Sequence, residues 1–189
     1  MKAIYALALS LLTLPALADN ERGFYIGAGV SSIDDLQDGI DNVSRIRAIE
    51  LFGGYKHNAA LGVELRLGNG QTTGTSNRYF DSQGKLQNGT IERDIGSYQS
   101  IYYKPELVND EAKLYALLGY THVNSSGRIL DAKGELVSSS DGSASGFSYG
   151  LGVGFVINEH FNINVEYKNI CEEISGKPNL ASVNIDYRF

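Results

Sequence analysis

The last ten residues of the chain alternate between apolar and polar side chains and end on an aromatic residue. One face of this segment, 180–189, carries the apolar set Ala181, Val183, Ile185, Tyr187 and Phe189. A period of two predicts a β-strand whose two faces meet different surroundings. Because about nine to eleven residues suffice for a strand to cross a bilayer, the segment predicts one span of a transmembrane barrel.

Seven segments earlier in the chain also have strand character, which gives eight predicted strands in all. They are 23–31, 46–56, 60–68, 95–104, 112–123, 146–157, 161–169 and 180–189. The segments 98–103 and 114–120 are apolar or aromatic on both faces, so the direction of their side chains stays open. Twenty-two glycines and only three prolines suit an all-β chain with many turns.

The connections between the predicted strands alternate in length. They are about three residues at 57–59 and 158–160, and roughly ten to twenty-six residues after strands one, three, five and seven. Short periplasmic turns and long outer loops are typical of outer-membrane barrels. The pattern therefore predicts an all-β fold, an eight-stranded antiparallel up-and-down transmembrane β-barrel with both ends in the periplasm.

The polar faces of the strands decide between this barrel and a soluble, lipocalin-like one, which would show its charges to water. An Arg or Lys that faced lipid near the midplane would cost about 2–4 kcal/mol, so in a membrane barrel the charges turn inward and pair. An eight-stranded barrel has room inside for side chains and little else. The sequence predicts a polar lumen core made of Glu50, Glu64, Arg66, Glu166, Lys168, Asp186 and Arg188.

The short turns also predict how neighbouring strands align. If the first turn is centred on Asn58, Glu50 lies opposite Arg66 as a buried ion pair. A three-residue loop at 158–160 places Gly152 opposite Glu166, and Gly150 opposite Lys168 by the same count. The two glycines would then leave volume for the long side chains across from them.

The start of the chain has the features of a secretory signal peptide. A basic residue, Lys2, precedes a mostly apolar run, and Ala16-Leu17-Ala18 is a small-x-small cleavage site. Residues 1–18 are therefore expected to be the signal and 19–189 the barrel domain. Without Lys2 the chain holds 15 basic and 22 acidic residues, a formal charge of −7, which argues against nucleic acid as a partner. With Cys171 as its only cysteine, the chain has no internal disulfide.

Several of these stretches resemble the small OmpA/OmpX-like outer-membrane barrel family. The glycine and aromatic runs at 23–30, 51–55 and 149–155, and the terminal Tyr187-Arg-Phe189, carry a resemblance that covers the whole mature chain. The resemblance implies the cell outer membrane, contact with its lipid and lipopolysaccharide, and a C-terminal assembly signal at Tyr187 and Phe189 that the barrel assembly machinery reads. The chain departs from full-length OmpA in ending at strand eight, without a peptidoglycan-binding domain.

Enzymatic chemistry has one candidate set. Some barrels of this size modify lipid A through a Ser/His/acid set at the outer rim, and His122 with Ser125 or Ser126 and Glu172 are the residues available here. Loop serines of this kind are common, so we favour a protein that is not an enzyme.

The first long loop carries four aspartates, Asp34, Asp35, Asp38 and Asp41, which suggest a divalent-cation site. The loop fails the EF-hand pattern, because Leu36 stands at the third ligand position and Arg45 at the twelfth. We therefore favour an acidic, solvated loop. The three histidines lack metal-ligand spacing, and we expect no cofactor and no metal.

Two later loops share a local repeat. The segments 79–86 and 129–136 both read as an apolar strand, an Asp-x-x-Gly turn and a second strand. We expect both loops to be hairpins that extend the barrel strands above the membrane, with edges able to add a strand from a partner. The leading functional hypothesis is a structural, adhesin-like surface protein that meets a host or surface ligand through its loops. The alternatives are a narrow porin-like channel and a lipid-A-modifying enzyme.

Overall fold

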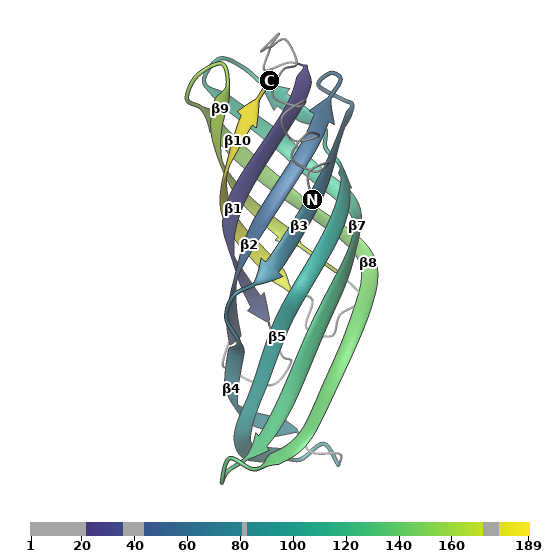
Figure 1. Ribbon diagram of the computed structural model, residues 1–189, viewed down its shortest axis with the longest axis vertical. Coiled ribbons are helices and arrows are strands. Elements are labelled where there is room, and N and C mark those ends of the chain that lie inside the picture. Colours follow the sequence, from purple (N-terminus) through teal and green to yellow (C-terminus); the bar gives the residue numbers. More distant parts are fainter. Residues whose placement is uncertain (1–21, 36–43, 81–82, 172–177) are drawn as a thin grey trace, which may run out of the picture.

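The chain forms a closed antiparallel β-barrel with a sheet that continues past one of its ends (Figure 1). The computed structural model describes residues 22–35, 44–80, 83–171 and 178–189. Its strands are β1 (Gly23–Asp35), β2 (Ser44–Lys56), β3 (Gly62–Gly70), β4 (Gly74–Phe80), β5 (Leu86–Tyr103), β6 (Glu106–Val108), β7 (Ala112–Asp131), β8 (Leu136–Val156), β9 (Phe161–Asn169) and β10 (Asn179–Arg188).

Eight of these strands make the barrel wall, in the order β1-β2-β3-β5-β7-β8-β9-β10. The wall closes because β10 pairs with β1, so that Ile26 lies opposite Tyr187. The short β6 continues the wall beyond Pro105 by pairing with β7, and β4 pairs with the outer part of β5. Proline has no N–H to give to the ladder, which explains the break between β5 and β6.

Side chains alternate between the two faces along the barrel strands. On β2 and β8, Leu51 and Leu151 are 61% and 65% exposed on the outside, whereas Glu50 is 1% exposed on the inside. Outward rows of Leu, Val, Ile, Phe and Tyr thus surround buried charges, which is the reverse of a water-soluble barrel. In the part of the chain that the structure describes, no helix is long and apolar enough to cross a membrane.

Each short turn at the end of the barrel where β1 begins and β10 ends, called the turn end here, begins with an asparagine. The Oδ1 atoms of Asn58, Asn109 and Asn158 each accept backbone N–H groups two and three residues further on, at 2.7–3.0 Å. An Asx turn of this kind replaces the first ladder bonds after the strand. The asparagine therefore opens the turn and does not sit at its centre.

This geometry corrects one predicted register and agrees with the other. The first loop is 58–60 and not 57–59, so Phe52 lies opposite Arg66 and Glu50 opposite Gly68. The predicted register, with Glu50 directly opposite Arg66, was therefore wrong by two residues, because Asn58 was placed at the centre of its turn. The predicted buried ion pair does form, with Arg66 Nη1 3.6 Å from Glu50 Oε2. The second loop is 158–160 as expected, and Gly152 lies opposite Glu166.

Both predicted hairpins are present, at the opposite end of the barrel, called the hairpin end here. β7 and β8 join through Asp131, whose Oδ1 accepts the N–H groups of Lys133 and Glu135 at 2.8 and 2.9 Å. Gly134 has φ +83° and Gly84, in the β4–β5 turn, has φ +76°, a conformation that L side chains rarely adopt. β4, β5, β7 and β8 form a four-stranded sheet that extends beyond the barrel (Figure 1).

Candidate functional site

The barrel interior is built around a cluster of buried charges from opposite walls. Arg66 on β3 makes two parallel hydrogen bonds to Glu166 on β9, at 2.6 and 2.7 Å, and its Nε donates to Glu64. Its Nη1 also lies 3.6 Å from Glu50 Oε2 on β2. Lys168 Nζ lies 2.6 Å from Glu50 Oε1, which ties β9 to β2 across the lumen. Bidentate pairing of this kind suits the planar guanidinium.

Three tyrosine hydroxyls complete the coordination of the glutamates. Tyr25 donates to Glu64 at 2.9 Å, Tyr98 to Glu50 at 2.9 Å and Tyr115 to Glu166 at 2.6 Å. Charged groups in a dry interior are tolerated only when they are paired and hydrogen-bonded. The tyrosines therefore fill the lumen and each donates a hydrogen bond to one glutamate, whereas Glu50 Oε2 accepts no hydrogen bond from the described residues.

A glycine provides the space for one of these tyrosines. A Cβ at Gly152 would overlap the Tyr115 ring. The expectation that Gly152 leaves room for the opposite Glu166 is thus corrected, because the ring of Tyr115 occupies that volume. At Gly150 a Cβ would collide with Lys168, as expected from their pairing.

A second charged layer lies closer to the turn end. Glu106 accepts from Lys56 at 3.1 Å and from Arg188 at 2.6 Å, and Lys113 lies 2.5 Å from Asp186. All seven residues predicted for the lumen core are buried inside the barrel. Among the residues that the structure describes, four further buried charges were not predicted: Lys56, Lys104, Glu106 and Lys113.

These four residues lie on β2, β6 and β7 or beside the break at Pro105, near strand ends. Lys56 and Lys113 continue the inward rows of Glu50 and Tyr115, so the alternation itself was the available signal. It was hidden around 98–120, where both faces of the strands are apolar or aromatic.

The hairpin end of the lumen is apolar. A cluster of buried side chains fills it: Ile33, Ile46, Ala48, Ile95, Tyr98, Val123, Ile170, Cys171 and Leu180. The polar core was expected to fill the lumen alone, and the structure adds this layer of packed hydrophobic groups between the polar core and the hairpin end. Cys171 is part of the layer and is a free thiol.

The filled lumen predicts that purified protein in planar bilayers shows no steady single-channel conductance. Ions would have to cross the apolar layer and displace ion pairs such as Arg66–Glu166, whose side chains are fully buried. The measurement is current against voltage at about 1 M salt, at which the Debye length is about 3 Å. Discrete, reproducible openings from several preparations would contradict the packing described here.

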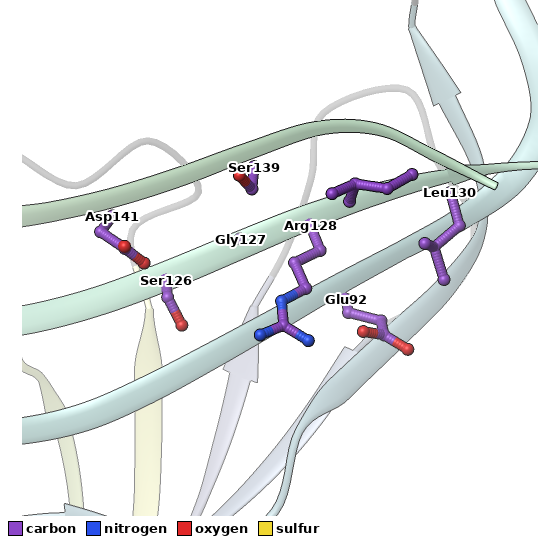
Figure 2. Close-up of a pocket in the computed structure, with 8 residues that line it drawn as sticks. Glu92, Ser126, Gly127, Arg128, Leu130, Ser139 and Asp141 are labelled. Atoms are coloured by element: carbon purple, nitrogen blue, oxygen red, sulfur yellow. The ribbon is translucent and has the colours of Figure 1, made fainter. Parts of the chain in front are cut away.

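A groove lies on the outward face of the extended sheet (Figure 2). It has a volume of about 530 Å³, and its lining residues are Glu92, Ser126, Gly127, Arg128, Leu130, Leu136, Ser139 and Asp141. Arg128 on β7 lies opposite Glu92 on β5, and its guanidinium points toward that strand in Figure 2. A ligand in this groove would thus meet one guanidinium, two carboxylates, serine hydroxyl groups and two leucine side chains.

The candidate catalytic set does not come together. His122 Nδ1 lies 2.6 Å from the hydroxyl of Ser145 on β8, whereas Ser126 is four positions along the strand, about 13 Å at 3.3 Å per residue. Ser125 belongs to the opposite face of β7 by alternation. Glu172 lies outside the described residues.

The aspartate-rich first loop falls largely outside the described residues. Asp34 pairs with Arg45 at 3.1 Å. Asp38 and Asp41 belong to the segment 36–43, which the structure does not describe. Among the described side chains, no group of three or more His, Cys, Asp or Glu could hold a metal ion.

The barrel is closed, apolar on the outside and charged on the inside, with short turns at one end and long hairpins at the other. These features together define a small transmembrane barrel of the cell outer membrane. The chain belongs to the family described as "Outer membrane protein beta-barrel domain", which matches residues 4–189. No curated protein sequence matches the chain.

Solved structures of other outer-membrane barrels share the fold. OprG of Pseudomonas aeruginosa has a TM-score of 0.59 at 16% identity, with 92% of this chain and 99% of that chain covered. Ail, the attachment invasion locus protein of Yersinia pestis, has a TM-score of 0.56 at 22% identity, with 89% and 99% covered. The β-barrel domain of Pseudomonas aeruginosa OprF has a TM-score of 0.54 at 12% identity, with 90% and 100% covered. At these identities the likeness concerns the fold.

Proposed function

We propose that this protein is a non-catalytic surface protein that attaches to a ligand through the sheet at its hairpin end. The observation that supports the proposal most directly is the sheet itself. β5, β7 and β8 are 18, 20 and 21 residues long, about twice the span that a bilayer requires of a strand. The part of each strand beyond the bilayer is not needed to cross the membrane. We therefore assign this part to contact with a ligand outside the cell, with the turn end in the periplasm.

The free edge of β8 supports attachment by strand addition. β9 pairs with β8 only from Val156 to Tyr149, and residues 136–148 have β7 as their one strand partner among the described residues. An open edge presents a row of N–H and C=O groups to an incoming extended segment. The segment 136–147 contains neither proline nor lysine, the residues that commonly block such edges.

The comparison with Ail is consistent with a surface ligand, and it does not transfer the ligand. Ail is an attachment invasion locus protein by name, and its structure is known in complex with the heparin analogue sucrose octasulfate. In the present chain, Arg128 lies between Glu92 and Ser139 across the sheet, and Asp141 lines the same groove. A densely sulfated ligand would meet these carboxylates, so we do not extend that ligand to this protein.

Removing the sheet is expected to abolish attachment while the barrel stays intact. In the test variant, Asn-Gly pairs replace residues 72–92 and 126–142, because Asn-Gly adopts the positive φ values that short hairpin loops require. Asn124 lies opposite Ser143, so in the second cut Ser125 and the Asn-Gly pair form a three-residue loop between two paired positions. Binding of cells that carry the variant to host cells or matrix is measured against cells with equal amounts of the complete protein.

A matched control replaces only the tip 132–135 with Asn-Gly, which leaves Leu130 and Leu136 paired on either side of a three-residue loop. The control is expected to attach nearly as well as the complete protein. Unchanged attachment after removal of both hairpins, with surface amounts verified, would overturn the proposed function.

The C-terminal aromatic residues support a separate proposal about assembly and the membrane. The Tyr187 ring lies 5.0 Å from that of Phe161, 5.1 Å from that of Phe189 and 5.3 Å from that of His160. The cluster faces the lipid side of the turn end, where a machinery in the periplasm would meet it. We therefore retain Tyr187 and Phe189 as the proposed assembly signal, and lipopolysaccharide as the proposed lipid around the hairpin end.

A further inference from the structure

The charges near the free edge of β8 limit which strand can pair with this edge. Two rows of outward side chains run across the sheet toward this edge. One row is Glu92, Arg128 and Ser139, and the next is Asp94, Ser126 and Asp141. The first row ends in a hydroxyl, and its two charges are of opposite sign on adjacent strands. The second row holds two carboxylates and ends with one of them at the edge.

Asp141 is the only charged residue between Leu136 and Tyr149. It is exposed, and its one neighbour in the row, Ser126, is uncharged. Within the described part of the chain, its carboxylate has no ion pair. Side chains directly opposite each other on adjacent strands attract when their charges differ and repel when they match. A strand added to β8 would complete the second row, and a cationic side chain would fit opposite Asp141.

The same residue argues against a second copy of this chain as the occupant. Two β8 edges would pair antiparallel about a two-fold axis near the middle of the segment 136–147. The two Asp141 side chains would then be adjacent or directly opposite, with no cation in the segment to compensate them. Like charges in such positions are destabilising, which is one way in which edge strands avoid pairing with themselves.

We propose that the free edge of β8 accepts an extended segment of a partner protein that carries Lys or Arg opposite Asp141, and that Asp141 disfavours pairing between two copies. This inference rests on the proposed function and specifies the partner as a cationic strand. The surrounding positions set further limits. The outward residues Ser139, Ser143 and Ser145 are small and polar, so they would tolerate β-branched residues of the added strand without demanding large ones.

The test uses the full protein in lipid nanodiscs and three synthetic peptides of eleven residues. The peptides alternate Thr and Val and differ at the centre, which is Lys in one and Glu in the second. The third is the Lys peptide with N-methylated backbone amides, which are unable to pair with a strand edge. Affinity is measured by fluorescence anisotropy at low salt, and protection of the amides of residues 138–146 by hydrogen exchange.

The Lys peptide is expected to bind about three- to tenfold more tightly than the Glu peptide. The Lys side chain would be attracted by Asp141 across the strands, whereas the Glu side chain would be repelled by it. Asp141→Asn should remove the difference and Asp141→Lys should invert it. Asp110→Asn, which removes an exposed acid at the turn end, should leave the difference unchanged. The N-methylated peptide should bind weakly and give no protection of β8.

The outcomes separate this inference from the proposed function. Equal affinities for the Lys and Glu peptides, with β8 protected, would overturn the role of Asp141 and leave strand addition standing. Binding of the N-methylated peptide as tight as that of its parent would overturn strand addition. Absence of binding by every peptide would overturn the inference, while the hairpin-removal experiment decides separately whether the sheet attaches to a ligand.

Discussion

Replacing Arg66 with leucine is expected to lower the free energy of unfolding by about 3–5 kcal/mol, the range found when one partner of a buried ion pair is removed. Arg66 is in contact with Glu64, Glu166 and Glu50, and all four side chains are fully buried. Without the guanidinium, the three carboxylates would keep Lys168 and Lys104 as their cationic partners within the described part of the chain. The measurement is urea unfolding of the refolded protein in lipid vesicles.

A matched surface variant gives the reference for this prediction. Arg45 pairs with Asp34, but their side chains are 73% and 43% exposed, so Arg45→Leu should cost no more than about 1 kcal/mol. In the double variant Arg66→Leu/Glu166→Leu, part of the loss should be recovered because one uncompensated carboxylate is removed with it. Equal stability of the two arginine variants would contradict the packing of the charged lumen.

Gly152→Val is expected to destabilise the barrel by about 1–3 kcal/mol through overpacking of the lumen. The added side chain would occupy the place of the Tyr115 ring, and a Cβ alone already overlaps it. The ring has little room to move, because its hydroxyl donates to Glu166 at 2.6 Å and Lys104 Nζ lies 4.3 Å from its centroid. Urea unfolding of this variant is compared with that of the unmodified chain.

The same strand offers the control. Gly142→Val makes the identical change on β8, but a Cβ at Gly142 has nothing within 4 Å. Valine favours strands, so this variant should be as stable as the parent or slightly more stable. A loss in Gly142→Val as large as that in Gly152→Val would show that the lumen packing is not the cause.

The faces of the barrel strands could be predicted because lipid on one side and a filled lumen on the other impose a period of two. Glu50, Glu64 and Arg66 were assigned to the interior on that basis, and they are buried there. The ends of the strands at the hairpin end were predicted less well, since β8 begins at Leu136 and not near 146. Beyond the membrane both faces of the sheet meet water, so residues 138–145 are mostly serine and glycine and carry no alternation.

The alignment of neighbouring strands was predictable only where the role of the turn residue was read correctly. Asn58 and Asn158 play the same part in their turns, but only the second was placed at the start of its loop. A further irregularity in β5, between Ile95 and Ser97, moves its outer residues to the opposite face. A bulge of one residue is hard to recognise in the sequence, because it shifts the alternation by one position without changing its period of two.

The sequence by itself determined the number of barrel strands and, for the strands that alternate clearly, the lipid-facing rows and the inward direction of the charges, because these depend on alternation within one strand. Only the tertiary structure decided which charges meet, since Lys168 and Glu50 are 118 positions apart and come into contact through closure of the barrel. Closure also joined Ile33, Val123 and Leu180 into an apolar layer, and among the described residues it left the edge of β8 without a strand partner beyond β9. Contacts across a lumen depend on the number, tilt and stagger of all the strands together, which no single segment contains.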